Sequence, residues 1–270
     1  MLSSAHIAQL FFPTADRSVS SLCRSRLRVL VLAGYLQQAE QLQTKSDGRR
    51  PYLYFLTAAG RNLLTRELGY EPEELDWKPS YNDVTWPFLD HQLAINDVFL
   101  AVSRAAEAMS WRVEQWIDDR FLRKAHTTTV EVVGDGGRVE RVAVVPDAYF
   151  VLARGEVLLH FFLELDRGTM ALSSESRLKR SWKRRIAAYQ AYFASPAIVE
   201  GYSTNRIRVL TVSSGGEGRV RHLCEATEEV GGMKRYWFTR CDALAATLTL
   251  TEAIWHVAQD PGLHPLLPRP

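Results

Sequence analysis

Two apolar runs that end in carboxylates constrain the fold of this chain most. Residues 142–145 precede Pro146-Asp147, and residues 158–163 lead into Glu164-Leu165-Asp166. Because side chains alternate along a strand, Glu164 and Asp166 are expected on one face of their strand. If the Asp147 strand is its hairpin neighbour, three carboxylates converge at one edge of a sheet.

Three converging carboxylates predict a cation site. Oxygen ligands suit Mg²⁺ or Mn²⁺, whereas like charges that crowd together without a cation raise their pKa values and cost stability. A divalent ion at this edge would polarise a phosphate oxygen and lower the pKa of an attacking water. Asp147, Glu164 and Asp166 are therefore the expected metal ligands and catalytic residues.

Composition limits the class of protein. A chain of 270 residues accommodates two domains, and its net charge is only +2. Cys23, Cys224 and Cys241 are odd in number and widely spaced, which fits neither a disulfide framework nor a zinc cluster, so we expect a cytoplasmic location. There is no secretory signal pattern, and the apolar runs are too short to span a membrane, so no membrane partner is expected.

The order of predicted elements divides the chain into four parts. We expect a DNA-binding domain over 1–70, an acidic and Pro-rich linker over 71–88, a larger domain over 89–258 and an irregular Pro-rich tail over 259–270. In the larger domain, helices are predicted at about 90–109, 175–194, 217–229 and 242–258, with strands at 111–121, 128–133, 139–152, 157–166, 206–213 and 234–239.

The first part reads as a winged helix-turn-helix. Two helices end near Pro13 and Gly34, and two strands over 35–42 and 51–56 form a wing before a last helix at 58–68. The second helix, 18–33, is expected to bury Val19, Leu22, Cys23, Leu27 and Leu30. Its opposite face and the wing carry the expected DNA contacts, which are Ser20, Ser21, Arg24, Ser25, Arg28, Lys45, Arg49 and Arg50.

Local charge favours DNA over the alternative, a winged helix used for protein contacts. Residues 17–50 hold seven basic side chains against two acidic ones. Such an excess is the electrostatic footprint of a nucleic-acid binder.

The second part has the α/β (α+β) layout of a PD-(D/E)xK restriction-endonuclease-like domain, a mixed sheet flanked by helices. Pro146-Asp147 supplies the first half of the motif, but Asp166 stands where Glu-x-Lys requires lysine. Lys179 and Lys183 on the following helix are candidates to replace it, and Arg180 and Arg184 are candidate phosphate contacts. A solvated basic face is the alternative for this helix.

His91 is a further candidate near the start of the helix at 90–109. Asn96 and Asp97 follow one to two turns later, so His91 could approach the acidic edge. The alternative is a histidine that simply packs in an apolar face.

Several segments together resemble the replication-relaxation proteins of actinobacterial plasmids and other mobile elements. They are Leu56-Thr-Ala-Ala-Gly60, His91 to Val98, Pro146-Asp147-Ala, Phe162 to Thr169 and the helix from Lys183 to Tyr189. The resemblance covers nearly the whole chain, and Glu164-Leu-Asp166-Arg-Gly-Thr is its most specific part. It implies a role in plasmid replication or DNA relaxation.

Three hypotheses follow for the function. The first is a DNA-binding protein whose second domain nicks or cuts DNA with Mg²⁺ or Mn²⁺. The second is a non-catalytic DNA-binding factor with a degenerate nuclease-like domain, which the missing lysine favours. The third is a module that recruits a replication or transfer protein. Double-stranded DNA is the expected partner, and a homodimer is left open.

Overall fold

The computed structural model describes residues 1–12, 19–41, 50–71, 75, 77–83, 86–133, 137, 139–168, 171–172 and 181–267. The chain is a mixed α+β protein that divides into two compact units, Met1–Leu100 and Ala101–Pro270. The division falls inside helix α4 (Trp86–Glu107), whereas the sequence placed a domain boundary after residue 88.

The first unit contains short helices around a small antiparallel sheet. In chain order its elements are β1 (Leu2–Ser3), α1 (Ser4–Phe11), α2 (Ser21–Leu32), β2 (Leu36–Ala39), β3 (Leu53–Leu56), α3 (Ala58–Leu68), a 3₁₀ turn (Pro79–Asn82) and the first part of α4. The strand order is β1-β3-β2. Side-chain oxygens of Ser3, Ser20 and Thr57 cap α1, α2 and α3, and Gly69 ends α3 in the left-handed conformation.

Two small cores hold this unit together. Cys23 and Leu27 of α2 pack with α1 and β3, and Leu89 of α4 packs with Leu53 and Phe55 of β3. The second contact explains why the start of α4 belongs to the first unit.

The buried stripe of α2 is narrower than expected. Leu22 and Leu30 were expected inside, but 58% and 38% of their surfaces are exposed. On α2 only Cys23 and Leu27, one turn apart, are buried. These two side chains are the part of the helix that packs in the small core with Ala8 of α1 and Tyr54 of β3.

Gly60 of α3 allows the helix to approach the backbone of Tyr35, just before β2. A Cβ atom at this position would lie 2.2 Å from the carbonyl oxygen of Tyr35. That same carbonyl accepts hydrogen bonds from the backbone and side chain of Thr57. Close packing against the Tyr35 carbonyl therefore explains why the Leu-Thr-Ala-Ala-Gly segment has glycine at position 60.

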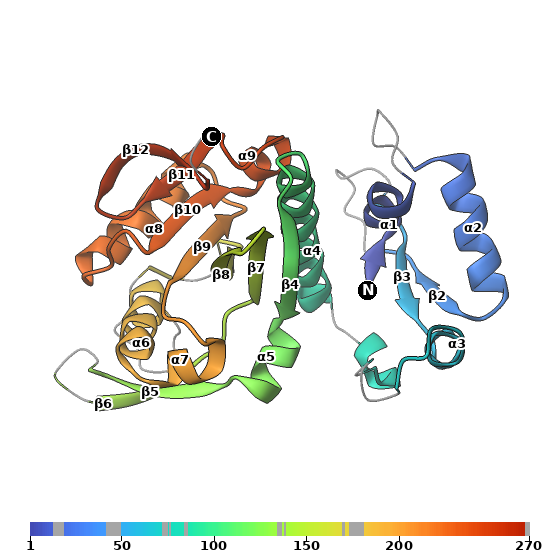
Figure 1. Cartoon of the computed structure of the whole chain (residues 1–270), viewed down its shortest axis with the longest axis horizontal. Helices are drawn as coiled ribbons and strands as arrows, with labels where there is room; N and C mark the ends of the chain where they lie inside the picture. The colour runs from blue at the N-terminus through green and yellow to red at the C-terminus, as the bar shows by residue number, and fades with distance from the viewer. Residues whose placement is uncertain are drawn as a thin grey trace. The chain divides into compact units, whose positions relative to one another are not determined.

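The second unit is built on a seven-stranded mixed sheet (Figure 1). Its strand order is β12-β11-β10-β9-β8-β7-β4, in which β8-β9 and β9-β10 are parallel and the remaining neighbours are antiparallel. The strands are β4 (Arg112–Asp118), β7 (Ala148–Arg154), β8 (Val157–Asp166), β9 (Ile207–Ser213), β10 (Tyr236–Arg240), β11 (Ala253–Val257) and β12 (Asp260–Pro265).

Helices and a separate hairpin complete this unit. They are α5 (Asp119–Ala125), the hairpin β5 (Thr128–Val133) and β6 (Val139–Val144), α6 (Trp182–Ala194), α7 (Ala197–Tyr202), α8 (Glu217–Glu229) and α9 (Cys241–Ala246). Apolar side chains of α6 and α8, among them Ile186, Tyr189 and Leu223, share one core with Phe162 of β8 and Val209 of β9. Burial of this face fixes α6 against β8, where the acidic residues lie.

The end of the chain differs from the sequence prediction. A helix was expected over 242–258, but α9 ends at Ala246 and β11 follows. The tail over 259–270 was expected to be irregular, yet Asp260–Pro265 forms β12. Prolines are tolerated in β12 because it is an edge strand of the sheet.

Candidate functional site

The hairpin β7-β8 places two of the three acids, Asp147 and Glu164, side by side. Ala148 pairs with Leu163, so Asp147 lies just before β7 beside Glu164. The Asp147 carboxylate accepts a hydrogen bond of 2.7 Å from the backbone N–H of Leu165. Glu164, Asp166 and Asp147 are all buried.

Asp166 is held by a bidentate arginine. Its two carboxylate oxygens accept hydrogen bonds of 2.9 and 2.7 Å from Arg219 of α8, and Ser213 of β9 donates a third of 2.7 Å. Burial favours the neutral acid, but the hydrogen bonds from Arg219, Ser213 and the backbone of Gly168 prevail and lower the pKa of Asp166. The side chain is therefore an ionised carboxylate with its charge compensated.

Glu164 has its own arginine on a different helix. Arg185 of α6 lies 2.6 Å from one carboxylate oxygen, and the Tyr189 hydroxyl donates to the other. Arg185 also donates to the carbonyl of Val145 at 3.2 Å. Burial raises the pKa of the Glu164 carboxyl to about 7, Asp147 acts in the same direction, and Arg185 acts against both.

The Tyr189 and Arg185 side chains respond to the same buried charge. Burial, followed by the negative charge of Glu164, raises the pKa of the Tyr189 hydroxyl well above its ordinary value. Burial alone would lower the pKa of Arg185, but the charges of Glu164 and Asp147 raise it. Tyr189 is therefore a neutral donor and Arg185 a permanent cation.

The described residues do not assemble the expected three-carboxylate site for Mg²⁺ or Mn²⁺. The acids of β8 are neutralised separately, by Arg185 and Arg219, so a guanidinium supplies the positive charge that a metal ion was expected to bring. Within the described ranges no group of three His, Cys, Asp or Glu side chains is arranged to hold a metal.

Of the basic residues expected to act on α6, Lys183 and Arg184 have acidic partners of their own. Lys183 pairs with Glu229 of α8, and Arg184 pairs with Glu140 of β6 at 2.7 Å. Lys179 and Arg180 lie outside the described residues. His91 lies on the part of α4 that belongs to the first unit, so the structure does not assign it to the acids of the second.

Sequence reasoning missed Arg185 and Arg219. Arg185 had a signal, because it lies three residues after Trp182 and four before Tyr189, at the border of the buried stripe of α6. An arginine at such a position needs a buried partner. Arg219 had none, because it is 53 residues from Asp166 and only the parallel packing of β8 and β9 brings α8 near.

On α2 the expected DNA contacts divide into exposed and structural residues. Ser21, Arg24, Ser25 and Arg28 are exposed, and so is Arg26. Ser20 instead caps the helix by accepting from the N–H of Cys23 at 3.1 Å.

The remaining expected contacts belong to the wing. Arg50 lies 3.7 Å from Asp90 of α4, so its charge is compensated within the first unit. Lys45 and Arg49 fall outside the described residues.

The outer surface of α2 also exposes apolar side chains. Leu22, Val29 and Leu32 are 58, 56 and 77% exposed. No acidic residue occurs between Ser21 and Leu32. The helix thus presents hydroxyls, arginines and apolar groups together.

Comparison with known proteins identifies one match. The family model described as replication-relaxation matches residues 1–204. No protein of curated function and no solved structure matches the chain. Among the helices of the described residues, none is both long and apolar enough to cross a membrane.

Proposed function

The chain belongs to the replication-relaxation family, and we propose that it binds double-stranded DNA in the replication or relaxation of plasmids or other mobile elements. The first unit would act as a winged helix-turn-helix, with α2 as the recognition helix and β2-β3 as the base of the wing. The order α1, α2, β2, β3, α3 supports this proposal.

One observation carries the proposal. Arg24, Arg26 and Arg28 are exposed on a helix without a single acid, and none of them forms an ion pair in the described part of the chain. Arginines in this state can bond guanine edges or phosphates, and exposed Leu22 and Val29 suit contact with thymine methyl groups. Ser21 and Ser25 add donors without charge.

Fluorescence anisotropy with a labelled duplex tests this assignment. Arg24→Ala with Arg28→Ala is expected to weaken binding by about 2–6 kcal/mol, since each arginine contact contributes about 1–3 kcal/mol. The charge-matched control is Arg66→Ala with Lys78→Ala, which removes two exposed cations of the same unit outside α2. Equal affinities for both double variants would remove α2 from the interface.

Metal-dependent cutting by the second unit is the competing proposal. Asp147 just before β7 and Glu164 near the end of β8 have the strand positions of the PD-(D/E)xK motif, which supports it. The arginine partners of Glu164 and Asp166 speak against it, and for this reason we favour the non-cutting alternative.

A nicking assay, in which the protein is incubated with supercoiled plasmid and Mg²⁺ or Mn²⁺, distinguishes the cutting from the non-cutting proposal. The non-cutting proposal expects the wild type to leave as much supercoiled DNA as Asp147→Ala or Glu164→Ala. Metal-dependent nicking that both variants lose would establish cutting instead.

A further inference from the structure

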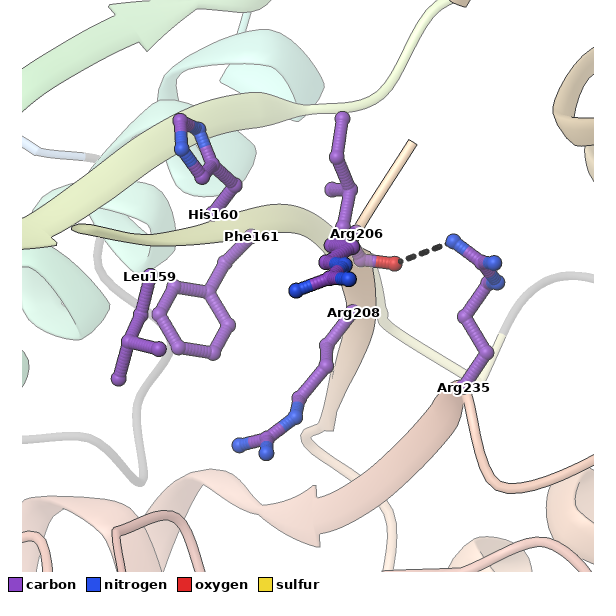
Figure 2. Close-up of a pocket in the computed structure, with 7 residues that line it drawn as sticks. Leu159, His160, Phe161, Arg206, Arg208 and Arg235 are labelled. Atoms are coloured by element: carbon purple, nitrogen blue, oxygen red, sulfur yellow. Dashed lines mark hydrogen bonds between the residues drawn. The ribbon is translucent and has the colours of Figure 1, made fainter. Parts of the chain in front are cut away.

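A second basic feature lies in the second unit, at the other end of the parallel strands from the acids. Figure 2 shows this pocket, which is lined by Leu159, His160, Phe161, Arg206, Ile207, Arg208 and Arg235 and has a volume of about 370 Å³. It forms where β9 begins, beside the first half of β8 and just before β10, whereas Asp166 and Ser213 pair at the far ends of β8 and β9.

Three arginines and no carboxylate line this pocket. In the described part of the chain, Arg206, Arg208 and Arg235 form no ion pair with an acid. Burial lowers the pKa values of Arg208 and Arg235, which shows that both charges are partly removed from water. A desolvated cation without a counter-charge is costly, and an anion relieves that cost.

The two half-buried arginines, Arg208 and Arg235, are held in place by neutral partners. Arg208 donates to the carbonyl of Leu266 at 3.0 Å and lies 4.7 Å from the ring centre of Trp237. Arg235 donates to the carbonyl of Ile207 at 3.0 Å and stacks on Phe193 at 4.0 Å. These contacts fix the guanidinium groups without neutralising them, so the site is ordered before a ligand arrives.

The rest of the lining is apolar or uncharged. Leu159 and Phe161 form an apolar wall beside Arg206 and Arg208 (Figure 2). His160 shares a hydrogen bond of 2.7 Å with the Tyr149 hydroxyl, and burial lowers its pKa, so it adds polarity rather than charge at neutral pH. An anionic group attached to a less polar body matches this combination.

We propose that this pocket binds the phosphate of a nucleotide, held by Arg206, Arg208 and Arg235, with the sugar or base against Leu159 and Phe161. Guanidinium groups bind phosphate oxygens through paired, charge-assisted hydrogen bonds. The volume lies at the lower end of the range for small-molecule sites, about 300–1,000 Å³. This suits one nucleotide, either free or within a single strand of DNA.

The proposal goes beyond DNA binding by α2 and does not depend on it. The arginines of the pocket lie after residue 204, outside the span that matches the family. They also lie in the other compact unit from α2.

Calorimetry with the full chain tests the pocket. The probes are dAMP, inorganic phosphate, deoxyadenosine and a short oligothymidine. Deoxyadenosine shows whether the phosphate is needed for binding. The oligothymidine shows whether the pocket takes a nucleotide within single-stranded DNA as well as a free one. Arg206→Ala suits the test because the Arg206 side chain is exposed and forms no hydrogen bond or ion pair within the described part of the chain. Arg221→Ala on α8, another exposed arginine of the same unit, is the matched control.

The proposal expects dAMP or the oligothymidine to bind, deoxyadenosine not to bind, and Arg206→Ala to weaken binding by about tenfold, the effect of one lost hydrogen bond to a charged group. Arg221→Ala should bind as the wild type does. Absence of binding by every phosphate-bearing probe would overturn the pocket. The pocket would also be overturned if oligothymidine still bound to Arg206→Ala but no longer bound to the double variant Arg24→Ala with Arg28→Ala.

Discussion

Removal of the Arg185 side chain is the most informative perturbation of the acidic cluster. Arg185→Met keeps a long aliphatic side chain at this position of α6 but deletes the cation 2.6 Å from Glu164, whose surface is only 2% exposed. Glu164 would then lose its counter-charge while it remains beside the carboxylate of Asp147. Breaking a buried pair in this way costs about 3–5 kcal/mol, because an uncompensated charge remains.

The cost depends on pH. Without Arg185 the carboxyl of Glu164 can avoid the cost of a buried negative charge by taking up a proton. Its pKa, already raised to about 7 by burial, should therefore rise further. Arg185→Met should therefore be less destabilised at acidic pH than above neutral pH. The double variant Arg185→Met with Glu164→Leu should recover much of the loss, since apolar replacements of buried pairs are often neutral or stabilising.

Urea unfolding at pH 6 and pH 8 measures these free energies. Lys183→Met is the matched control, because Lys183 lies on the same helix and its pair with Glu229 is partly exposed to solvent. Such a pair contributes about 0–1 kcal/mol. Equal costs for Arg185→Met and Lys183→Met, or a double variant as unstable as the single one, would refute the role of Arg185 as a buried counter-charge.

Three further predictions concern other parts of the molecule. Because the pKa of Asp166 is lowered, its contribution to stability is present above about pH 4 and is lost as the pH falls below it; urea unfolding of Asp166→Asn should show a smaller loss between pH 5 and pH 3 than the wild type. Gly60→Ala should lower the free energy of unfolding by about 1–3 kcal/mol, despite the better helix propensity of alanine, because the new Cβ meets the Tyr35 carbonyl. Mn²⁺ should raise the thermal midpoint of Arg185→Met, whose acids lack their cation, and leave that of the wild type unchanged; a shift of the wild type alone would contradict this.

Local patterns in the sequence were sufficient for much of the fold. The hairpin β7-β8 follows from two apolar runs joined at Gly155, and α8 was expected at 217–229, where the structure has it. The strand β12 was missed because Pro261 and Pro265 indicate irregular structure unless the strand is known to lie at an edge. Edge position is a property of the whole sheet and cannot be read locally.

The candidate site shows the same limit. The proximity of Asp147 and Glu164 could be predicted, since hairpin strands alternate side chains in a known way. The state of these acids could not, because it depends on Arg185 and Arg219 from two separate helices. Acidic residues that are close in sequence can be recognised as a cluster, whereas their basic partners on distant helices cannot.

The salt dependence of duplex binding tests the central claim, that α2 holds DNA through its exposed arginines, which form no ion pair in the described part of the chain. The logarithm of the association constant falls with the logarithm of salt concentration by about 0.9 for each phosphate contact. If Arg24 and Arg28 contact phosphates, Arg24→Ala with Arg28→Ala should reduce this slope by about 1.8, since two contacts are lost. An unchanged slope together with unchanged affinity at every salt concentration would contradict the account.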